Sequence, residues 1–180
     1  LLDAIRASDR ESYLLGQIYL HGTWLYFPVA FAAKTPLPTL IALLFAIILL
    51  IRSRSLLLAD LFLLTPVIIF FAIAACSNLN IGLRHILPVY PFLFVWIGGM
   101  VATIWASRSR TARWGVSLLG IWLLVSSLKV YPDYLAFFNE LAGGPANGHN
   151  VLVDSNLDWG QDLKGLRVWM SNHGLTRIQL

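Results

Sequence analysis

Residues 56–76 read LLLADLFLLTPVIIFFAIAAC, and Asp60 is the one charged side chain in these 21 residues. A helix of about 20 apolar residues crosses the roughly 30 Å of hydrocarbon in a bilayer. Three further runs meet or approach this length: 36–51, 86–106 and 114–130. Prolines inside the runs predict kinks, which are tolerated where neighbouring helices cover the freed carbonyls. The sequence therefore predicts an α-helical polytopic membrane protein with four transmembrane helices.

The composition points to the same class of protein. AVILMFWYC residues make up 58% of the 180 residues and charged residues 12%, against about 25% charged in a soluble domain. This excludes a disordered chain and argues against an ordinary soluble domain. The single cysteine, Cys76, excludes a disulfide framework or an all-cysteine metal site within the chain. We interpret the excess of 13 basic over 9 acidic residues as a topology signal and expect no nucleic-acid partner.

The positions of the arginines predict an orientation. Two short connections, 52–55 and 107–113, carry five of them, and positive residues in short loops stay cytoplasmic. Three segments are then predicted outside: 1–35, 77–85 and everything after about 131. Arg84 lies on this outer side, where the rule disfavours it, and its presence needs a separate reason. We expect a multi-pass protein of the inner (plasma) membrane.

The chain divides into four predicted parts: an extracytoplasmic interfacial segment (1–35), the transmembrane domain (36–130), an interfacial helix and linker (131–150) and the start of a soluble α/β domain (151–180). Aromatic and polar residues mixed over 12–33 predict a membrane-surface helix and loop. Thr35 is the expected N-cap of the first span, with Pro36 as its first residue. The stretch 131–141, YPDYLAFFNEL, predicts a second interfacial helix.

The last thirty residues predict the opening of an extracytoplasmic βαβ unit. VLVDS (151–155) is typical of a short buried strand, and TRIQL (176–180) of a second one parallel to it. Between them we expect a helix from Asp158 to Asn172, with Asp158 and Gln161 forming a capping box. The chain begins at Leu1 and ends inside a predicted strand, so we expect it to be a piece of a longer protein.

Two cations at the outer ends of predicted spans are candidate binding residues. Arg84 lies with His85 in NIGLRHILPVYP (80–91), and Lys34 precedes the first span. A guanidinium binds phosphate in a bidentate fork and an ammonium binds it as a point charge. The alternative is that both residues only anchor the helices at the lipid headgroups.

Other candidates are weaker. Asp154, Asp158 and Asp162 are four residues apart and would share one face of a helix, but capping and turn roles explain them as well. Trp159 either stacks on a sugar or anchors the outer domain. No histidine spacing indicates a metal site, so we predict no metal-binding residues.

Several strings together resemble the GT-C type membrane glycosyltransferases. They are GTWLYFPVAFAAKTPLP (22–38), GLRHILPVYPFL (82–93), YPDYLAFFNELAGGPANG (131–148) and VDSNLDWGQDL (153–163). The chain is similar to the C-terminal half of bacterial members, which are related to the protein mannosyltransferases and the aminoarabinose lipid A transferase. The resemblance covers nearly the whole chain.

The resemblance implies transfer of a sugar from a polyprenyl-phosphate donor to an acceptor on the extracytoplasmic face, with membrane lipids as further partners. It implies that Arg84, Lys34 and His85 hold the donor's lipid phosphate. His85 stands where the family commonly has Tyr. The catalytic carboxylate of the family lies in an earlier loop, so no catalytic residue is assigned here. The cofactor is unknown, with a divalent cation among the alternatives.

Two other functions remain open. Half of a membrane transporter would be expected to carry charged residues at mid-membrane, and the four runs carry none there. A membrane-anchored binding or assembly protein would have no need of cations at matched depth on the outer side. An acidic residue in the first outer loop of the full-length protein would favour the enzyme, and an inverted repeat of the four spans would favour the transporter.

Overall fold

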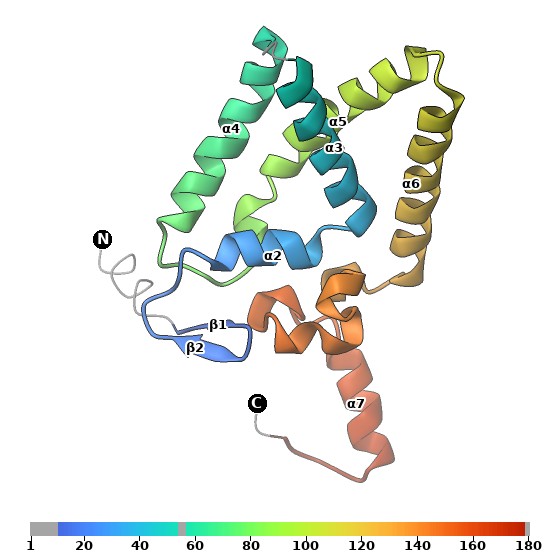
Figure 1. Ribbon diagram of the computed structural model, residues 1–180. Helices are drawn as coiled ribbons and strands as arrows, with labels where there is room; N and C mark the ends of the chain where they lie inside the picture. Colours follow the sequence, from blue (N-terminus) through green and yellow to red (C-terminus); the bar gives the residue numbers. More distant parts are fainter. Residues whose placement is uncertain (1–10, 54–56, 179–180) are drawn as a thin grey trace.

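The computed structural model describes residues 11–53 and 57–178, and it is built mainly from helices (Figure 1). The four longest are α3 (Leu37–Ser53), α4 (Leu58–Ala75), α5 (Val89–Ala106) and α6 (Arg110–Lys129). They coincide with the four predicted apolar runs to within four residues at either end. By length and composition α4, α5 and α6 could each cross a membrane, and α3 adds a fourth candidate when it is joined to α2 (Tyr26–Lys34).

The chain turns by 113° between α2 and α3, so α2 lies across one end of the bundle of long helices (Figure 1). We take α3 to α6 as the candidate membrane-spanning segments, with α2 lying across their end. The predicted N-cap is wrong, because Thr35 ends α2 by donating its backbone N–H to Phe31. The carbonyl of Pro36 accepts from Leu40, and α3 starts one residue later. The Thr35 hydroxyl instead bonds to the Tyr90 hydroxyl at 2.8 Å.

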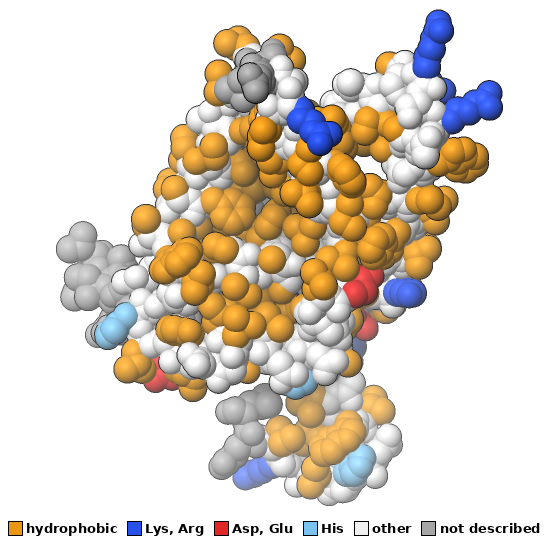
Figure 2. All heavy atoms as spheres, in the orientation of Figure 1, with side chains coloured by type: hydrophobic (Ala, Val, Ile, Leu, Met, Phe, Trp, Pro, Cys, Tyr) orange, Lys and Arg blue, Asp and Glu red, His pale blue; other side chains and the backbone are white. Residues whose placement is uncertain are grey.

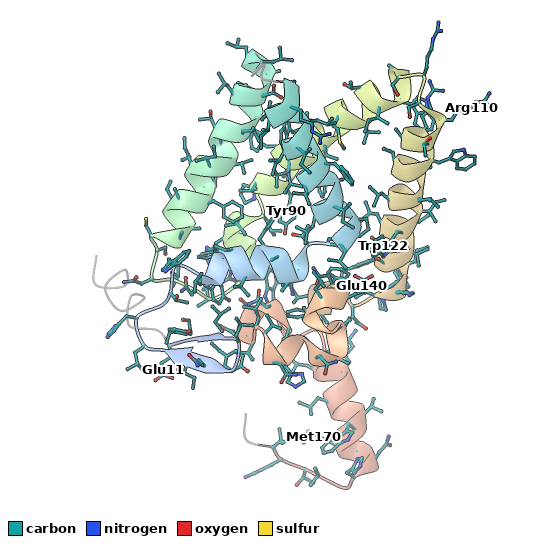
Figure 3. The ribbon with its side chains drawn as sticks, in the orientation of Figure 1. Glu11, Tyr90, Arg110, Trp122, Glu140 and Met170 are labelled. Atoms are coloured by element: carbon teal, nitrogen blue, oxygen red, sulfur yellow. The ribbon has the colours of Figure 1, made fainter. Side chains whose placement is uncertain are left out.

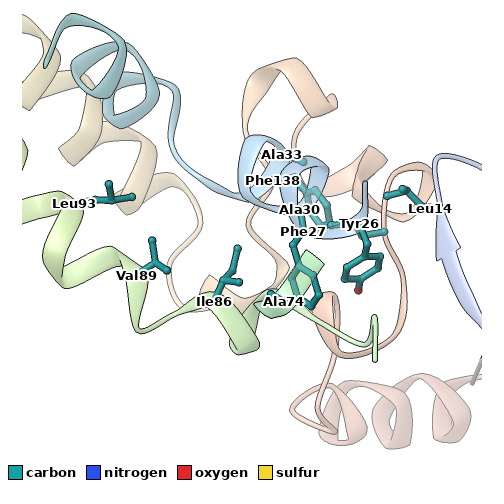
Figure 4. Close-up of a cluster of buried hydrophobic side chains, with 11 residues drawn as sticks. Leu14, Tyr26, Phe27, Ala30, Ala33, Ala74, Ile86, Val89, Leu93 and Phe138 are labelled. Carbon is teal, nitrogen blue, oxygen red and sulfur yellow. The ribbon is translucent and has the colours of Figure 1, made fainter. Parts of the chain in front are cut away.

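The core of the molecule surrounds α2. Tyr26, Phe27 and Ala30 are at most 2% exposed and pack against the start of α5 and the segment after α6 (Figure 4). Ile86 and Leu152, from these two regions, are fully buried in the same cluster. The second half of the aromatic stretch is therefore a helix, as predicted, and one side of this helix is covered by protein.

A β-hairpin that was not predicted from the sequence precedes α2. The strands β1 (Ser12–Leu14) and β2 (Gln17–Tyr19) pair antiparallel around a two-residue turn. Leu15 and Gly16 both have positive φ, at 51° and 83°, as a turn of this handedness requires. The hairpin was missed because the aromatic content of 12–33 hid a short alternating pattern on either side of Gly16, and the place of this segment at the membrane surface stays a prediction.

The segment after α6 forms tight turns in place of the predicted interfacial helix at 131–141. It contains four 3₁₀ turns: η2 (Tyr134–Ala136), η3 (Glu140–Ala142), η4 (Pro145–Asn150) and η5 (Asp154–Asn156). Asn139 explains much of this, because its side chain caps η3 by accepting from the Ala142 N–H. Figure 3 shows Glu140 beside Trp122 of α6, whose Nε1 donates to its carboxylate at 3.1 Å.

The predicted βαβ unit is wrong as far as residue 178, because this part of the chain contains no strand. Val151 offers its carbonyl to Leu15 and Leu152 enters the core, while Asp154 takes a positive φ of 61° that ends any extended run. An isolated strand without a partner cannot satisfy its backbone groups. Residues 179 and 180 of the predicted second strand lie outside the described residues.

The helix of this region, α7, spans Leu163–Asn172 and starts five residues later than predicted. The predicted capping box does not form. Asp158 accepts from the Gly160 N–H at 2.8 Å and Gln161 accepts from the Trp159 N–H at 2.7 Å. Both side chains therefore shape a turn ahead of the helix, a role that competes with capping for the same residue types.

The surface of the long helices is apolar, and the basic side chains lie near their ends (Figure 2). On α4, Leu58, Phe62 and Ile73 are 65% to 86% exposed. Exposed apolar area on this scale is unfavourable in water and suits a lipid environment. Arg52 and Arg110 lie at the end of the bundle opposite α2.

The two ends of the bundle should differ in accessibility from outside the cell. In a Cys76→Ser background, Ala146→Cys should react with an impermeant maleimide applied to intact cells, and Thr111→Cys should react only after permeabilisation. Both positions are exposed, so access depends on the membrane alone. Labelling of Thr111→Cys in intact cells would reverse the orientation.

Candidate functional site

Lys34, at the end of α2, is held inside the protein. Its ammonium donates to the carbonyl of Leu135 at 2.8 Å and to the carbonyl of Asn156, and it lies 4.5 Å from the centre of the Phe138 ring. The side chain is 9% exposed. Burial lowers the pKa of Lys34 to about 8, which leaves it mostly protonated at neutral pH. Lys34 thus joins α2 to two distant turns and has one ammonium hydrogen left for another acceptor.

Arg84 lies in the 3₁₀ turn η1 (Leu83–Ile86), just before α5. Two bonds fix this turn to η5, because the Leu83 N–H donates to Asn156 Oδ1 at 3.0 Å and the Ser155 hydroxyl donates to the Ile81 carbonyl. The guanidinium itself is exposed. Within the described part of the chain it makes no hydrogen bond or ion pair. The backbone of the site is therefore held by two hydrogen bonds, while the guanidinium is left accessible to a ligand.

Trp159 lies against Arg84. The guanidinium carbon is 5.6 Å from the centre of the indole ring, within the range of a cation–π contact. The indole Nε1 donates to the Ser155 carbonyl at 2.7 Å, which fixes the ring, and 58% of its surface remains exposed. Of the two roles left open for Trp159, the structure assigns a contact with the start of α5, and its exposed face leaves stacking available.

These three side chains line one pocket of about 280 Å³, which we call the junction pocket. Its other walls include Pro36 just before α3, Leu87 between η1 and α5, and Tyr134 in the turns after α6. Lys34 and Arg84, fifty residues apart in sequence, therefore share one pocket at one end of the apolar bundle. The walls of the junction pocket are mainly apolar. A charged group bound in the pocket would therefore find few polar partners besides Lys34 and Arg84.

His85 is placed away from the junction pocket. Its ring meets the edge of Phe27 with 6.3 Å between ring centres, and its Nε2 is buried without a partner in the described residues. Burial lowers the pKa of His85, and the neighbouring charge of Arg84 lowers it further. His85 is therefore neutral at physiological pH and packs against α2. The other candidate set is also dispersed, because Asp154, Asp158 and Asp162 do not share one helix face.

Two buried asparagines organise the site, and neither was predicted from the sequence. Asn156 is 1% exposed; its Nδ2 donates to the Tyr26 hydroxyl at 2.8 Å while its Oδ1 holds Leu83. Asn139 is also 1% exposed, and its Nδ2 donates to the carbonyls of Ala32 and Thr35 at the end of α2. The last carbonyls of a helix need such partners. In the sequence, only the pair Asn139–Glu140 indicated that one of them, Asn139, could cap a helix or turn.

Comparison with protein-family models, with curated proteins and with solved structures finds no match to this chain. The residues and geometry of the junction pocket are therefore the basis for inferring a function.

Proposed function

We propose that this chain is part of a membrane glycosyltransferase that takes a sugar from a polyprenyl-phosphate donor on the extracytoplasmic face. The observation that carries the proposal is the junction pocket, which is lined by two cations from separate elements at one end of an apolar helix bundle. A lipid phosphate combines an anionic group with a long apolar chain. Such a ligand matches a cationic pocket that borders membrane-spanning helices.

The two cations would act differently. Arg84 would bind the phosphate, because its guanidinium is exposed, makes no hydrogen bond to a described residue and can form two parallel hydrogen bonds. Lys34 would add a fixed positive charge, with two of its hydrogens already bound by carbonyls. His85 would support the turn that carries Arg84. The residue that activates the acceptor is expected elsewhere in the full-length protein, and we assign none here.

Binding of the donor's lipid part tests this proposal directly. We expect the purified full-length protein in nanodiscs to bind polyprenyl phosphate at least about tenfold more tightly than the matching polyprenol, the value of one charge-assisted hydrogen bond. High salt should weaken the difference, because the Arg84 guanidinium is exposed and its charge is screened by ions.

The matched control is Arg108→Ala, which removes an exposed arginine from the opposite end of the bundle and should leave this preference unchanged. Equal affinity for polyprenyl phosphate and polyprenol in the unmodified protein would reject the proposed function.

A further inference from the structure

A second pocket, of about 230 Å³, lies beside the hairpin, and we call it the hairpin pocket. It is lined by the β1 edge with Glu11, by Tyr26 of α2, by Asn80 of the 77–82 loop and by Asp154 of η5. Figure 3 shows Glu11 beside the hairpin, at the end of the molecule that carries α2. Asp154 lines this pocket while Ser155 and Asn156 line the junction pocket. Consecutive residues of one turn therefore border both pockets.

Two side chains of this pocket carry polar atoms without a partner. Ser12 is 3% exposed and Asn80 is 4% exposed, yet Ser12 Oγ and Asn80 Oδ1 make no hydrogen bond to any described residue. The amide of Asn80 is oriented by its Nδ2, which donates to the Thr23 carbonyl at 2.9 Å. Its Oδ1 must then accept from something else. An unpaired buried polar group costs about 1–3 kcal/mol, so two of them in one small pocket indicate a ligand.

The mixture of donors and acceptors selects the chemistry of that ligand. Asn80 Oδ1 and the carboxylates of Glu11 and Asp154 only accept, so the ligand must bring several donors. Ser12 Oγ can also donate, and the Tyr26 hydroxyl, which accepts from Asn156, keeps its own proton. An ammonium group would leave those two protons unused. Hydroxyl groups, which both donate and accept, satisfy the whole set.

Apolar surface completes the match. Tyr13 and Ile18 line the pocket next to the polar groups, and an aromatic ring offers a flat surface to C–H groups. A small ring with hydroxyls on its rim and C–H groups on its face is a sugar. We propose that the hairpin pocket binds one sugar ring through its hydroxyl groups. The choice of a sugar deepens the proposed glycosyltransferase function, but binding at this pocket can be measured without the transfer reaction.

Ser12→Ala is the sharpest test, because it removes a hydroxyl that makes no hydrogen bond to any described residue. The probes are methyl glycosides of a hexose, a pentose and an N-acetylhexosamine, titrated into the full-length protein in nanodiscs and followed by calorimetry. We expect at least one glycoside to bind, and Ser12→Ala to weaken it about three- to tenfold, the value of one neutral hydrogen bond. The unfolding temperature should stay equal or rise.

A second variant, Asp154→Asn, removes an acceptor charge at an exposed position and should weaken the same glycoside. Ser171→Ala on the exposed face of α7 is the matched control and should have no effect. If Ser12→Ala also weakens binding of the polyprenyl-phosphate sugar, the sugar ring in the hairpin pocket is that of the donor. If a glycoside binds without displacing that donor, the ring belongs to the acceptor.

The proposal is overturned if no glycoside binds, if ethanolamine binds in place of the glycosides, or if Ser12→Ala leaves glycoside affinity unchanged. These results are independent of the polyprenyl-phosphate preference that tests the junction pocket. Either proposal can therefore fail while the other stands.

Discussion

Asn156→Ala is expected to destabilise the protein more than any other single truncation of a polar side chain in the junction. The substitution leaves the Leu83 N–H without its acceptor and removes the donor to the buried Tyr26 hydroxyl. Each buried group left unpaired costs about 1–3 kcal/mol, and the turn that carries Lys34's acceptor would loosen as well. Thermal unfolding of the full-length protein in detergent should show a clear drop in midpoint.

Asn156→Asp separates the contribution of the acceptor, Oδ1, from that of the donor, Nδ2. It keeps an acceptor for the Leu83 N–H and loses the amide donor, so its unfolding midpoint should lie between those of Asn156→Ala and the unmodified protein. Asn172→Ala, at the exposed end of α7, is the matched control and should cost little. A midpoint for Asn156→Ala equal to that of Asn172→Ala would mean that Asn156 does not hold the junction together.

The four long helices could be predicted because their signal is local. A run such as 56–76 needs no knowledge of its neighbours to be identified as a helix of membrane-crossing length, and α4 occupies Leu58–Ala75. The proximity of Arg84 and Lys34 could also be predicted. Both precede runs that start on the same side of the bundle, and matched depth placed them in one pocket.

The turns outside the bundle could not be predicted in the same way, because distant residues determine them. VLVDS has the composition of a strand, yet Leu152 is drawn into the core around α2 and no neighbouring strand is present for it to pair with in the described chain. The roles of Asn139 and Asn156 depend on residues between 73 and 130 positions away. The hairpin could have been predicted, since short alternating runs flank Gly16.

The role of Trp159 could not be decided from its sequence context. Its sequence context allowed a sugar platform or a domain anchor, and the structure places the indole against Arg84 with more than half of its surface still exposed. The ring both limits where the guanidinium can go and shields one of its faces from water. An arginine restrained in this way loses less freedom when it binds a phosphate.

Arg84→Ala should therefore give the largest functional loss of any substitution in the junction pocket. It removes the exposed guanidinium and, with it, hydrogen bonds to a charged ligand worth about 1.5–3 kcal/mol, or at least about tenfold in donor affinity. Arg84→Lys keeps the charge, loses the bidentate fork and should retain partial activity. The fold should tolerate both, because the side chain is exposed and its turn is held through Leu83 and Ser155.

The measurement is sugar transfer from a polyprenyl-phosphate donor by the full-length protein, with KM for the donor and kcat determined at matched expression. Loss of phosphate binding should raise KM, and misplacement of the bound donor should lower kcat. Arg108→Ala controls for the general loss of a surface arginine. If Arg84→Ala keeps both constants, the residue is only a headgroup anchor. Its position on the side where positive residues are disfavoured would then need an explanation other than the donor.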